Sequence, residues 1–310
     1  MGLLLLGFFV VVGVVAPLLY PGDPNSLPTD YNVLYGCQDP SPPTISTSPW
    51  VLGPHPFGET AHLGLDVAWS LLLGTRWDLL FLAIIIGVSV LVGSLLGAAA
   101  GAVGGWTETV LGPVFDGVLS FPPFLVVLLV PVVAALPGAS SWLKTEAFVV
   151  AMLAVLWAPF AQGVRAKSRM LVRQPFVEAA RAAGARWPRI LWRHILPNSM
   201  APVLAQIPAT IFSVLFTLGA YQYLGLISNG TPRCGYKTDP AGSFLFLPSY
   251  HFPEWTWTMA NGVTGYFPPG FGVDDWWAYL IPSAWILLFI LAVTLVCDGL
   301  VGHLDPYLRH

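Results

Sequence analysis

Charged residues are scarce in this chain. Asp, Glu, Lys and Arg make up 9% of the 310 residues, whereas soluble globular proteins hold about 25%. Hydrophobic residues make up 55% of the chain. This composition excludes a soluble globular protein and indicates one with several membrane spans. The net charge of −3 says little by itself. Acidic residues such as Asp23, Asp30 and Asp39 have few basic neighbours, however, and this argues against binding to nucleic acid, which needs a basic surface.

Motifs for catalysis and nucleotide binding are missing as well. The chain has no G-x-x-x-x-G-K-[ST] sequence, so it cannot itself be a P-loop ATPase. Neither H-E-x-x-H nor G-x-S-x-G occurs. His55 and His62 have only Glu59 or Asp66 as nearby ligands, and no cluster of Cys or His accompanies them. We therefore expect no metal site, no catalytic residue and no cofactor bound by this chain.

Six apolar stretches are long enough to cross a membrane, which takes about 20 residues. They are residues 1–19, 79–103, 113–136, 147–164, 202–224 and 278–300. The fold class that follows is all-α, a polytopic membrane protein with six transmembrane helices in one domain, residues 1–310. The first stretch has the length of a secretory signal, but it lacks a basic start and Pro17 follows its small residues. We therefore expect it to be retained as a span.

A basic segment, residues 165–199, lies between the fourth and fifth stretches. Eight of the thirteen Lys and Arg residues of the chain fall within it. Such loops are found on the cytoplasmic side of membranes. With six spans, both termini are then cytoplasmic, and the long segments 20–78 and 227–277 lie outside.

Two short helices are predicted inside the basic segment. Pro175 suits the first turn of a helix, and Gly184 suits the left-handed conformation that ends one. Pro188 then opens a second helix, which Pro197 is expected to stop. Alanines keep the first helix slim, so that another protein can approach closely, and Phe176 offers an apolar anchor.

The residue order in this segment resembles the EAA loop of ABC importer permeases, the loop that an ATPase subunit grips. The matching residues are Glu178-Ala179-Ala180, then Gly184, then His194-Ile195-Leu196-Pro197. His194 stands where the general pattern has Ile, and it is the form that the peptide branch of the family shows.

Further motifs of the peptide and nickel branch occur along the chain. They are Gly53-Pro54-His55-Pro56-Phe57-Gly58, Gly104-Gly105-Trp106, Leu119-Ser120-Phe121-Pro122-Pro123, Tyr223-Leu224-Gly225-Leu226 and Leu304-Asp305-Pro306. The likeness covers about residues 53–309 and is closest to the C-type (DppC/OppC-like) permease subunits of dipeptide and oligopeptide importers. Leu65 stands where the family usually has an arginine, so the role of that arginine is not carried over.

The resemblance implies a set of partners. A second, homologous permease would complete the translocation path, two ABC ATPase subunits would bind ATP and Mg, and an extracytoplasmic binding protein would deliver the substrate. The residues expected to couple this chain to the ATPases are Phe176, Glu178, Ala179, Ala180, Gly184, Arg189, His194, Leu196 and Pro197. Di- or oligopeptides are the expected substrates. Oligosaccharides or nickel stay open within the same class, and a passive channel or an intramembrane enzyme stays open outside it.

Polar residues inside the predicted spans are candidates for the translocation path. Ser213, Thr217 and Tyr221 share a broad face of the fifth span, which either lines the path or packs on a neighbour. Asp116 either contacts substrate or pairs with a basic residue at the cytoplasmic interface, since a charge buried in a membrane is costly without a partner.

The two outer segments hold one cysteine each, Cys37 and Cys234. We expect them to form a disulfide on the oxidising side of the membrane, although two unrelated thiols stay open. The aromatic residues of segment 227–277 suggest an outer platform for the binding protein or a lid over the entrance.

Overall fold

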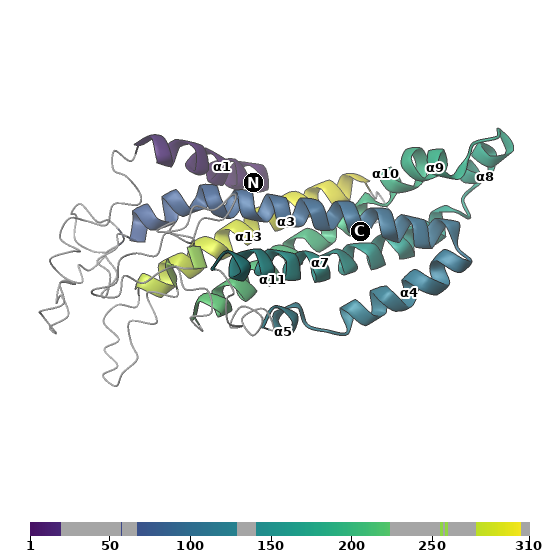
Figure 1. Ribbon diagram of the computed structural model, residues 1–310. Coiled ribbons are helices and arrows are strands. Elements are labelled where there is room, and N and C mark those ends of the chain that lie inside the picture. The colour runs from purple at the N-terminus through teal and green to yellow at the C-terminus, as the bar shows by residue number, and fades with distance from the viewer. Residues whose placement is uncertain are drawn as a thin grey trace, which may run out of the picture.

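A computed structural model shows the chain as an elongated bundle of helices (Figure 1). The structure describes residues 1–19, 57, 67–128, 141–223, 255–256, 258–259 and 277–304. Within these residues there is no β-strand. The long helix α3 (Val67–Val103) packs along α7 (Ser141–Leu171). Three more helices surround this pair: α1 (Gly2–Leu19), α11 (Met200–Tyr223) and α13 (Trp277–Leu304).

Each of these five helices is long and apolar enough to cross a membrane. The all-α, polytopic fold class predicted from the sequence is therefore confirmed. The helices also run past the predicted limits of their spans. Helix α7 extends beyond 147–164 at both ends, and α13 continues four residues past position 300.

The predicted span at 113–136 is not one continuous helix. Helix α4 (Trp106–Leu119) begins after two glycines with positive φ, Gly104 and Gly105, and the short α5 (Pro123–Leu128) follows it. Pro122 lies between the two helices and Pro123 opens α5; neither has an N–H to donate, and each disfavours helical geometry in the residue before it. Residues 129–140, the rest of this predicted span, lie outside the described residues.

Helix α3 begins twelve residues earlier than the predicted second span, so the assignment of residues 67–78 to an outer loop was wrong. Two polar residues of this stretch, Thr75 and Asp78, are both buried. The Thr75 hydroxyl donates to the carbonyl of Leu71, 2.7 Å away. The Asp78 carboxylate accepts a hydrogen bond from the backbone N–H of Trp255. Polar groups that find partners inside the protein do not end a helix.

Glycines allow α3 and α7 to approach closely. A Cβ at Gly93 would lie 2.8 Å from the Cβ of Phe160, and one at Gly101 would lie 3.0 Å from the Cβ of Ser168. At Gly97 a Cβ would collide with the backbone of Ala161. Gly87, by contrast, has open space around it. The row of small residues therefore packs inside this chain, as such rows do between membrane helices.

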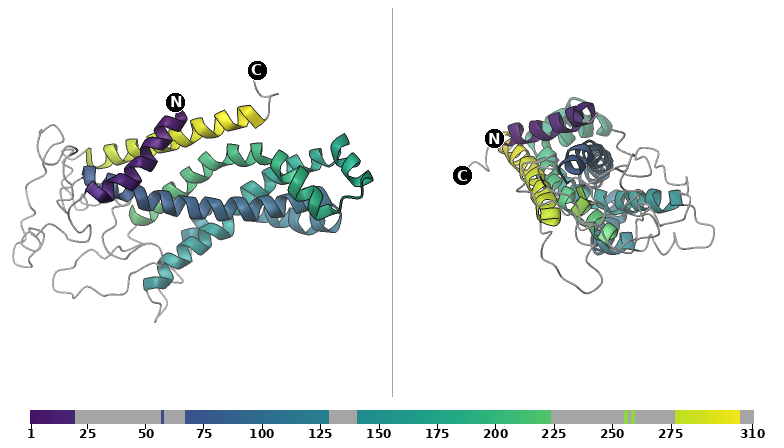
Figure 2. Two further views of the ribbon diagram at one scale, coloured as in Figure 1. Left: turned by 90° about the horizontal axis from the view of Figure 1, so that it is seen from above. Right: turned by 90° about the vertical axis from the view of Figure 1, so that its left-hand side faces the viewer.

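The two ends of the described chain point the same way. Gly2 of α1 lies against Leu295 and Val296, in the last third of α13. Figures 1 and 2 show the start of α1 beside α13, and Figure 1 shows α13 ending near α10, towards the end of the bundle that carries α8 and α9.

A short piece of the expected outer segment 227–277 lies in the core instead. Trp255 is fully buried, and its ring packs edge-on against Phe9 and Phe289, with centroids 5.8 and 5.1 Å away. Its indole N–H lies 3.2 Å from both the Leu71 carbonyl and the Thr75 hydroxyl. This tryptophan therefore does not belong to an exposed platform, because aromatic and polar groups enclose it inside the bundle. The lid alternative for segment 227–277 stays a prediction, since most of the segment lies outside the described residues.

Candidate coupling site

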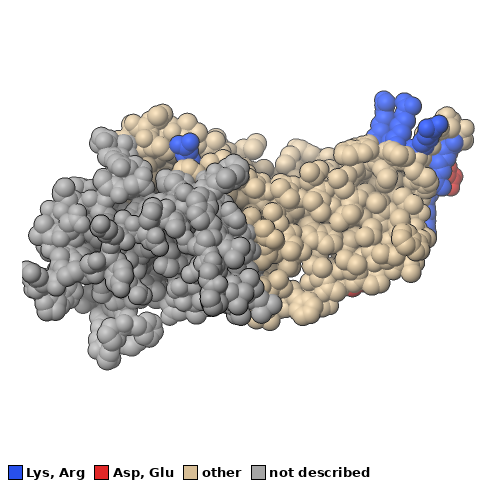
Figure 3. All heavy atoms as spheres, in the orientation of Figure 1, with Lys and Arg blue, Asp and Glu red and all other residues tan. Residues whose placement is uncertain are grey.

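The basic segment, residues 165–199, leaves the bundle at one end and returns to it. Figure 1 shows α8 (Pro175–Ala182) and α9 (Trp187–Ile190) projecting beyond α7 and α3. Figure 3 shows that Lys and Arg side chains gather on this end of the molecule. The geometry thus presents a small helical projection with a basic surface.

Helix α8 starts and stops where the sequence predicts. Pro175 occupies its first turn after Gln174, which has extended backbone angles. At its end Gly184 has φ of +80°. The N–H of Gly184 donates to the Arg181 carbonyl at 2.9 Å, and that of Ala185 donates to the Ala180 carbonyl at 3.0 Å. This pair of bonds is a Schellman motif, which satisfies carbonyls at the helix end and requires the left-handed residue.

The second helical part is longer than predicted. Helix α9 continues into a π-helix, η1 (Leu191–Ile195), and then into α10 (Leu196–Asn198). Pro197 does not end the helical segment. It lies in the first turn of α10, where its missing N–H is not needed. The stop comes two residues later at Ser199, whose buried hydroxyl donates to the Leu196 carbonyl.

Two buried isoleucines fix the projection to the bundle. Ile190 is the last residue of α9 and Ile195 the last residue of η1, and both are buried. With Val177 of α8 they join a cluster that includes Ala98 of α3 and Val164 of α7. Sequence reasoning missed Val177, and no periodicity within such a short helix marks it.

The predicted coupling residues divide into two groups. The exposed ones form the outer surface: Phe176, Glu178, Ala179, Gly184, Arg189 and Pro197. Leu196 is only 9% exposed and packs in the cluster at the base, so it anchors the segment and offers no contact surface. Ala180 and His194 are half-buried.

Two aromatic contacts join α8 to the second helical part. The ring of Phe176 lies 6.2 Å from that of His194. The guanidinium of Arg181 lies over the ring of Trp187, 4.4 Å from its centre. This cation–π pair bridges the Gly184 bend. Neither contact was anticipated, because nothing in the spacing of these residues reveals how two helices fold back on one another.

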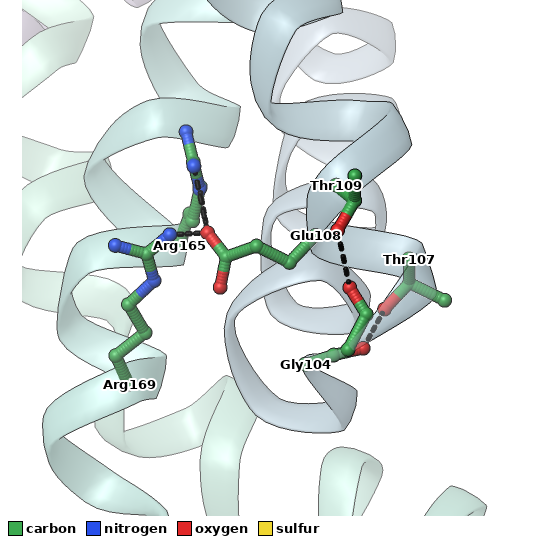
Figure 4. A network of polar contacts seen from close by, with 7 residues as sticks. Gly104, Thr107, Glu108, Thr109, Arg165 and Arg169 are labelled. Atoms are coloured by element: carbon green, nitrogen blue, oxygen red, sulfur yellow. Dashed lines mark hydrogen bonds and ion pairs between the residues drawn. The ribbon is translucent and has the colours of Figure 1, made fainter.

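An ion-pair cluster lies on the bundle side of the segment (Figure 4). Arg165 donates to Oε1 of Glu108 from Nη2 at 2.7 Å and from Nε at 3.1 Å. Arg169, one turn further along α7, pairs with the same oxygen. The sequence left open whether Asp116 contacts substrate or pairs with a basic residue. Asp116 is exposed and has no basic partner among the described residues, whereas Glu108, which the sequence did not single out, pairs with both arginines.

The candidate path residues on α11 are not equally accessible. Thr217 is 1% exposed, and its hydroxyl donates to the Ser213 carbonyl at 2.7 Å. In this protomer it therefore does not face an open path, whereas Ser213 is half-buried. Tyr221 lies within α11, but its side chain falls outside the described residues, as do Cys37 and Cys234. The exposed side of α11 carries Phe212 and Phe216 instead.

Comparison with known proteins decides the family. Residues 93–310 match the model for the inner membrane component of binding-protein-dependent transport systems. The chain belongs to this family. The matched region includes the whole basic segment, α11 and α13.

Full-length relatives agree with this membership. The chain is 31% identical to a candidate peptide transport system permease protein of Brucella suis, over 99% of this chain and 87% of the relative. It is 26% identical to the dipeptide transport system permease protein DppC of Alkalihalophilus pseudofirmus, over 99% and 85%. It is 28% identical to the oligopeptide transport system permease protein OppC of Bacillus subtilis, again over 99% and 85%. The resemblance seen in the sequence motifs is thereby confirmed.

Proposed function

We propose that this chain is one of two permease subunits of an ATP-driven importer of di- or oligopeptides. The observation that carries the proposal is the projection at residues 175–198. Val177, Ile190 and Ile195 pack its base against the bundle. Its tip exposes Phe176, alanines and arginines, which a partner can contact. A rigid projection with an open tip suits a part that is pushed by another protein and passes the displacement to its own helices.

The partner at the tip is an ABC ATPase subunit, with ATP and Mg bound there and not by this chain. The exposed alanine face of α8 allows close approach, and Arg189 and Arg193 supply charge around it. The basic segment then lies in the cytoplasm. Both termini lie on the same side, since the start of α1 and the end of α13 point towards this end.

Peptides are favoured as the substrate because the named relatives belong to peptide, dipeptide and oligopeptide transport systems. An extracytoplasmic binding protein selects the substrate, and a second permease completes the path against α4, α5 and α11. The exposed Phe212, Phe216 and Leu125 are the apolar surface available for that contact. Oligosaccharides or nickel would be carried by the same machinery with a different binding protein.

The test is reconstitution of the chain with its neighbouring permease, ATPase and binding-protein genes. The complex should co-purify and take up labelled di- and tripeptides into proteoliposomes only when ATP and the binding protein are both present. A passive channel predicts flux from the isolated chain without ATP, and that result would reject the proposal. Competition of peptide uptake by nickel ions or by oligosaccharides decides between the substrate classes.

A further inference from the structure

Helix α4 is held to the rest of the chain along a narrow line. It leaves α3 through the bend at Gly104 and Gly105, and of its fourteen residues only Gly112 and Phe115 are buried. Phe115 packs edge-on against Trp157 of α7, with ring centroids 5.5 Å apart. Phe115 and the partly buried Leu111 also pack with Ala100 of α3 and Ala161 of α7. The polar contact lies in the first turn of α4 at Glu108.

Glu108 faces two arginines on successive turns of α7. Arg165 makes two hydrogen bonds to its Oε1, and Arg169 pairs with the same atom. The side chains of Glu108 and Arg165 are 27% and 16% exposed. A charge-assisted pair that is largely shielded from water is stronger than a surface pair. Glu108 also lies near the positive end of the α4 dipole, which favours a carboxylate there.

Close packing fixes the position of Arg165. Its guanidinium lies 5.8 Å from the centre of the Phe115 ring. A Cβ at Gly112 would lie 2.7 Å from its Nη2, and one at Gly101 would lie 3.0 Å from its Cα. The absence of side chains at these two glycines leaves room for the arginine between α3, α4 and α7. The ion pair is therefore built into a junction of three helices.

The same helix α7 leads directly into the coupling projection. Arg169 lies six residues before Pro175, where α8 begins. Because the glycine row packs α7 tightly on α3, a push on the projection displaces these two helices together. Helix α4 has only a small apolar contact with them, around Phe115 and Leu111, and so this contact and the Glu108 ion pair decide whether it follows.

We propose that Glu108 is a positioning residue for transport, the tie through which α4 follows α7 when the coupling projection is displaced. The tie stays closed through the cycle, and α4 passes the movement to α5, where Phe124 contacts Phe216 of α11 at a ring distance of 6.1 Å. This inference rests on the proposed coupling function. It adds the residue that carries displacement from the ATPase side to the helices expected to form the path.

The first experiment uses the complete complex carrying Glu108→Ala, with Asp298→Ala as a control that removes an exposed carboxylate from α13 instead. Spin labels replace the exposed Val114 of α4 and Met170 of α7, in a background without the three native cysteines. The distance between the labels is measured without nucleotide and after trapping with ATP and vanadate in the presence of the binding protein.

If the Glu108 ion pair stays closed, the distance between the two labels should be narrowly distributed and the same without nucleotide and in the trapped state, for both the parent chain and the control. For Glu108→Ala the tie predicts a broader or shifted distance in the trapped state. Uptake of a labelled dipeptide pool per ATP hydrolysed should fall on the order of tenfold, within the usual range of coupling between sites, while co-purification of the ATPases is unchanged. Glu108→Asp should restore most of the uptake, because the charge is kept.

A covalent link tests whether the contact must stay closed. Cysteines at positions 108 and 169 are joined by a short bifunctional maleimide in the same background. Recovery of uptake after linking supports a permanent tie, whereas linking that blocks uptake means that the contact is a gate that must open. An unchanged label distance with unchanged uptake in Glu108→Ala would also overturn the proposal. Failure of the parent chain to bind the ATPases rejects the coupling function itself, and failure to take up peptides with the label response intact rejects only the peptide substrate.

Discussion

The backbone N–H of Trp255 donates a hydrogen bond to Oδ2 of Asp78, 2.9 Å away, across 177 positions of sequence. The bond joins Trp255, which lies between α11 and α13 in the sequence, to the buried first part of α3. It lies beside the indole of the same tryptophan, which packs against Phe9 and Phe289. Together with the buried Thr256 and Thr258, Trp255 anchors this short piece of the chain in the bundle.

Trp255→Ala should destabilise the protein severely. Removing a fully buried tryptophan costs about 3–5 kcal/mol through lost contacts and the cavity left behind. Thermal unfolding of the purified protein in detergent measures the loss. Trp192→Ala is the matched control, because Trp192 is 62% exposed and its removal leaves no cavity. Equal effects from the two substitutions would show that Trp255 is not part of the core.

Asp78→Ala should cost about 1–3 kcal/mol, the penalty for a buried donor left without its acceptor. Asp78→Asn should cost less, because the amide oxygen can still accept from the Trp255 N–H. The order of the two unfolding temperatures is the measurement. An asparagine variant that is less stable than the alanine variant would contradict the role of Asp78 as acceptor.

Gly184→Val should weaken binding of the ATPase subunits while leaving the bundle folded. The φ of +80° costs an L residue about 1–2 kcal/mol, and valine has more steric conflict there than most residues. The Schellman bonds that set the angle between α8 and α9 would then be lost. Gly87→Val is the control, because Gly87 also has open space around it but lies inside the helix α3. Co-purification of the ATPases decides, and undiminished binding would contradict the prediction.

Gly97→Val should push α3 and α7 apart, because any Cβ there collides with the backbone of Ala161. Overpacking of this kind costs about 1–3 kcal/mol. The same Gly87→Val control should stay close to the parent chain in an unfolding experiment in detergent. Loss of stability should be accompanied by weaker ATPase binding, since α7 leads into the projection.

Cys37 and Cys234 are predicted to form a disulfide between the two outer segments, and the described residues do not test this. The loop-entropy model assigns closures of this length a stabilisation on the order of 5 kcal/mol. Peptide mapping without reductant should recover one fragment that contains both residues. Complete alkylation of both thiols without prior reduction would eliminate the bond. Cys297, which is buried in α13, is free.

Sequence reasoning succeeded where the signal is local. Helix α8 begins at Pro175 and ends before Gly184 as predicted, because proline and a left-handed glycine act through their own backbone angles. It failed at Pro197, whose effect depends on whether a helix ends or begins there. It failed at residues 67–78, which it left in the segment before the second span, because the buried partners of Thr75 and Asp78 are revealed only in the folded chain. It also did not anticipate that Glu108 pairs with Arg165 and Arg169, and it left open whether Asp116 pairs with a basic residue or contacts substrate.

By itself, the sequence determined the class of the protein, the membrane-spanning character of its helices and the position of the coupling segment, since hydrophobic length and backbone preference are properties of neighbouring residues. The tertiary structure decided which residues meet. That Trp255 reaches Asp78, that Arg165 and Arg169 converge on Glu108, and that Phe115 meets Trp157 all depend on packing between helices. Such contacts join residues far apart in the chain, and no local pattern encodes them.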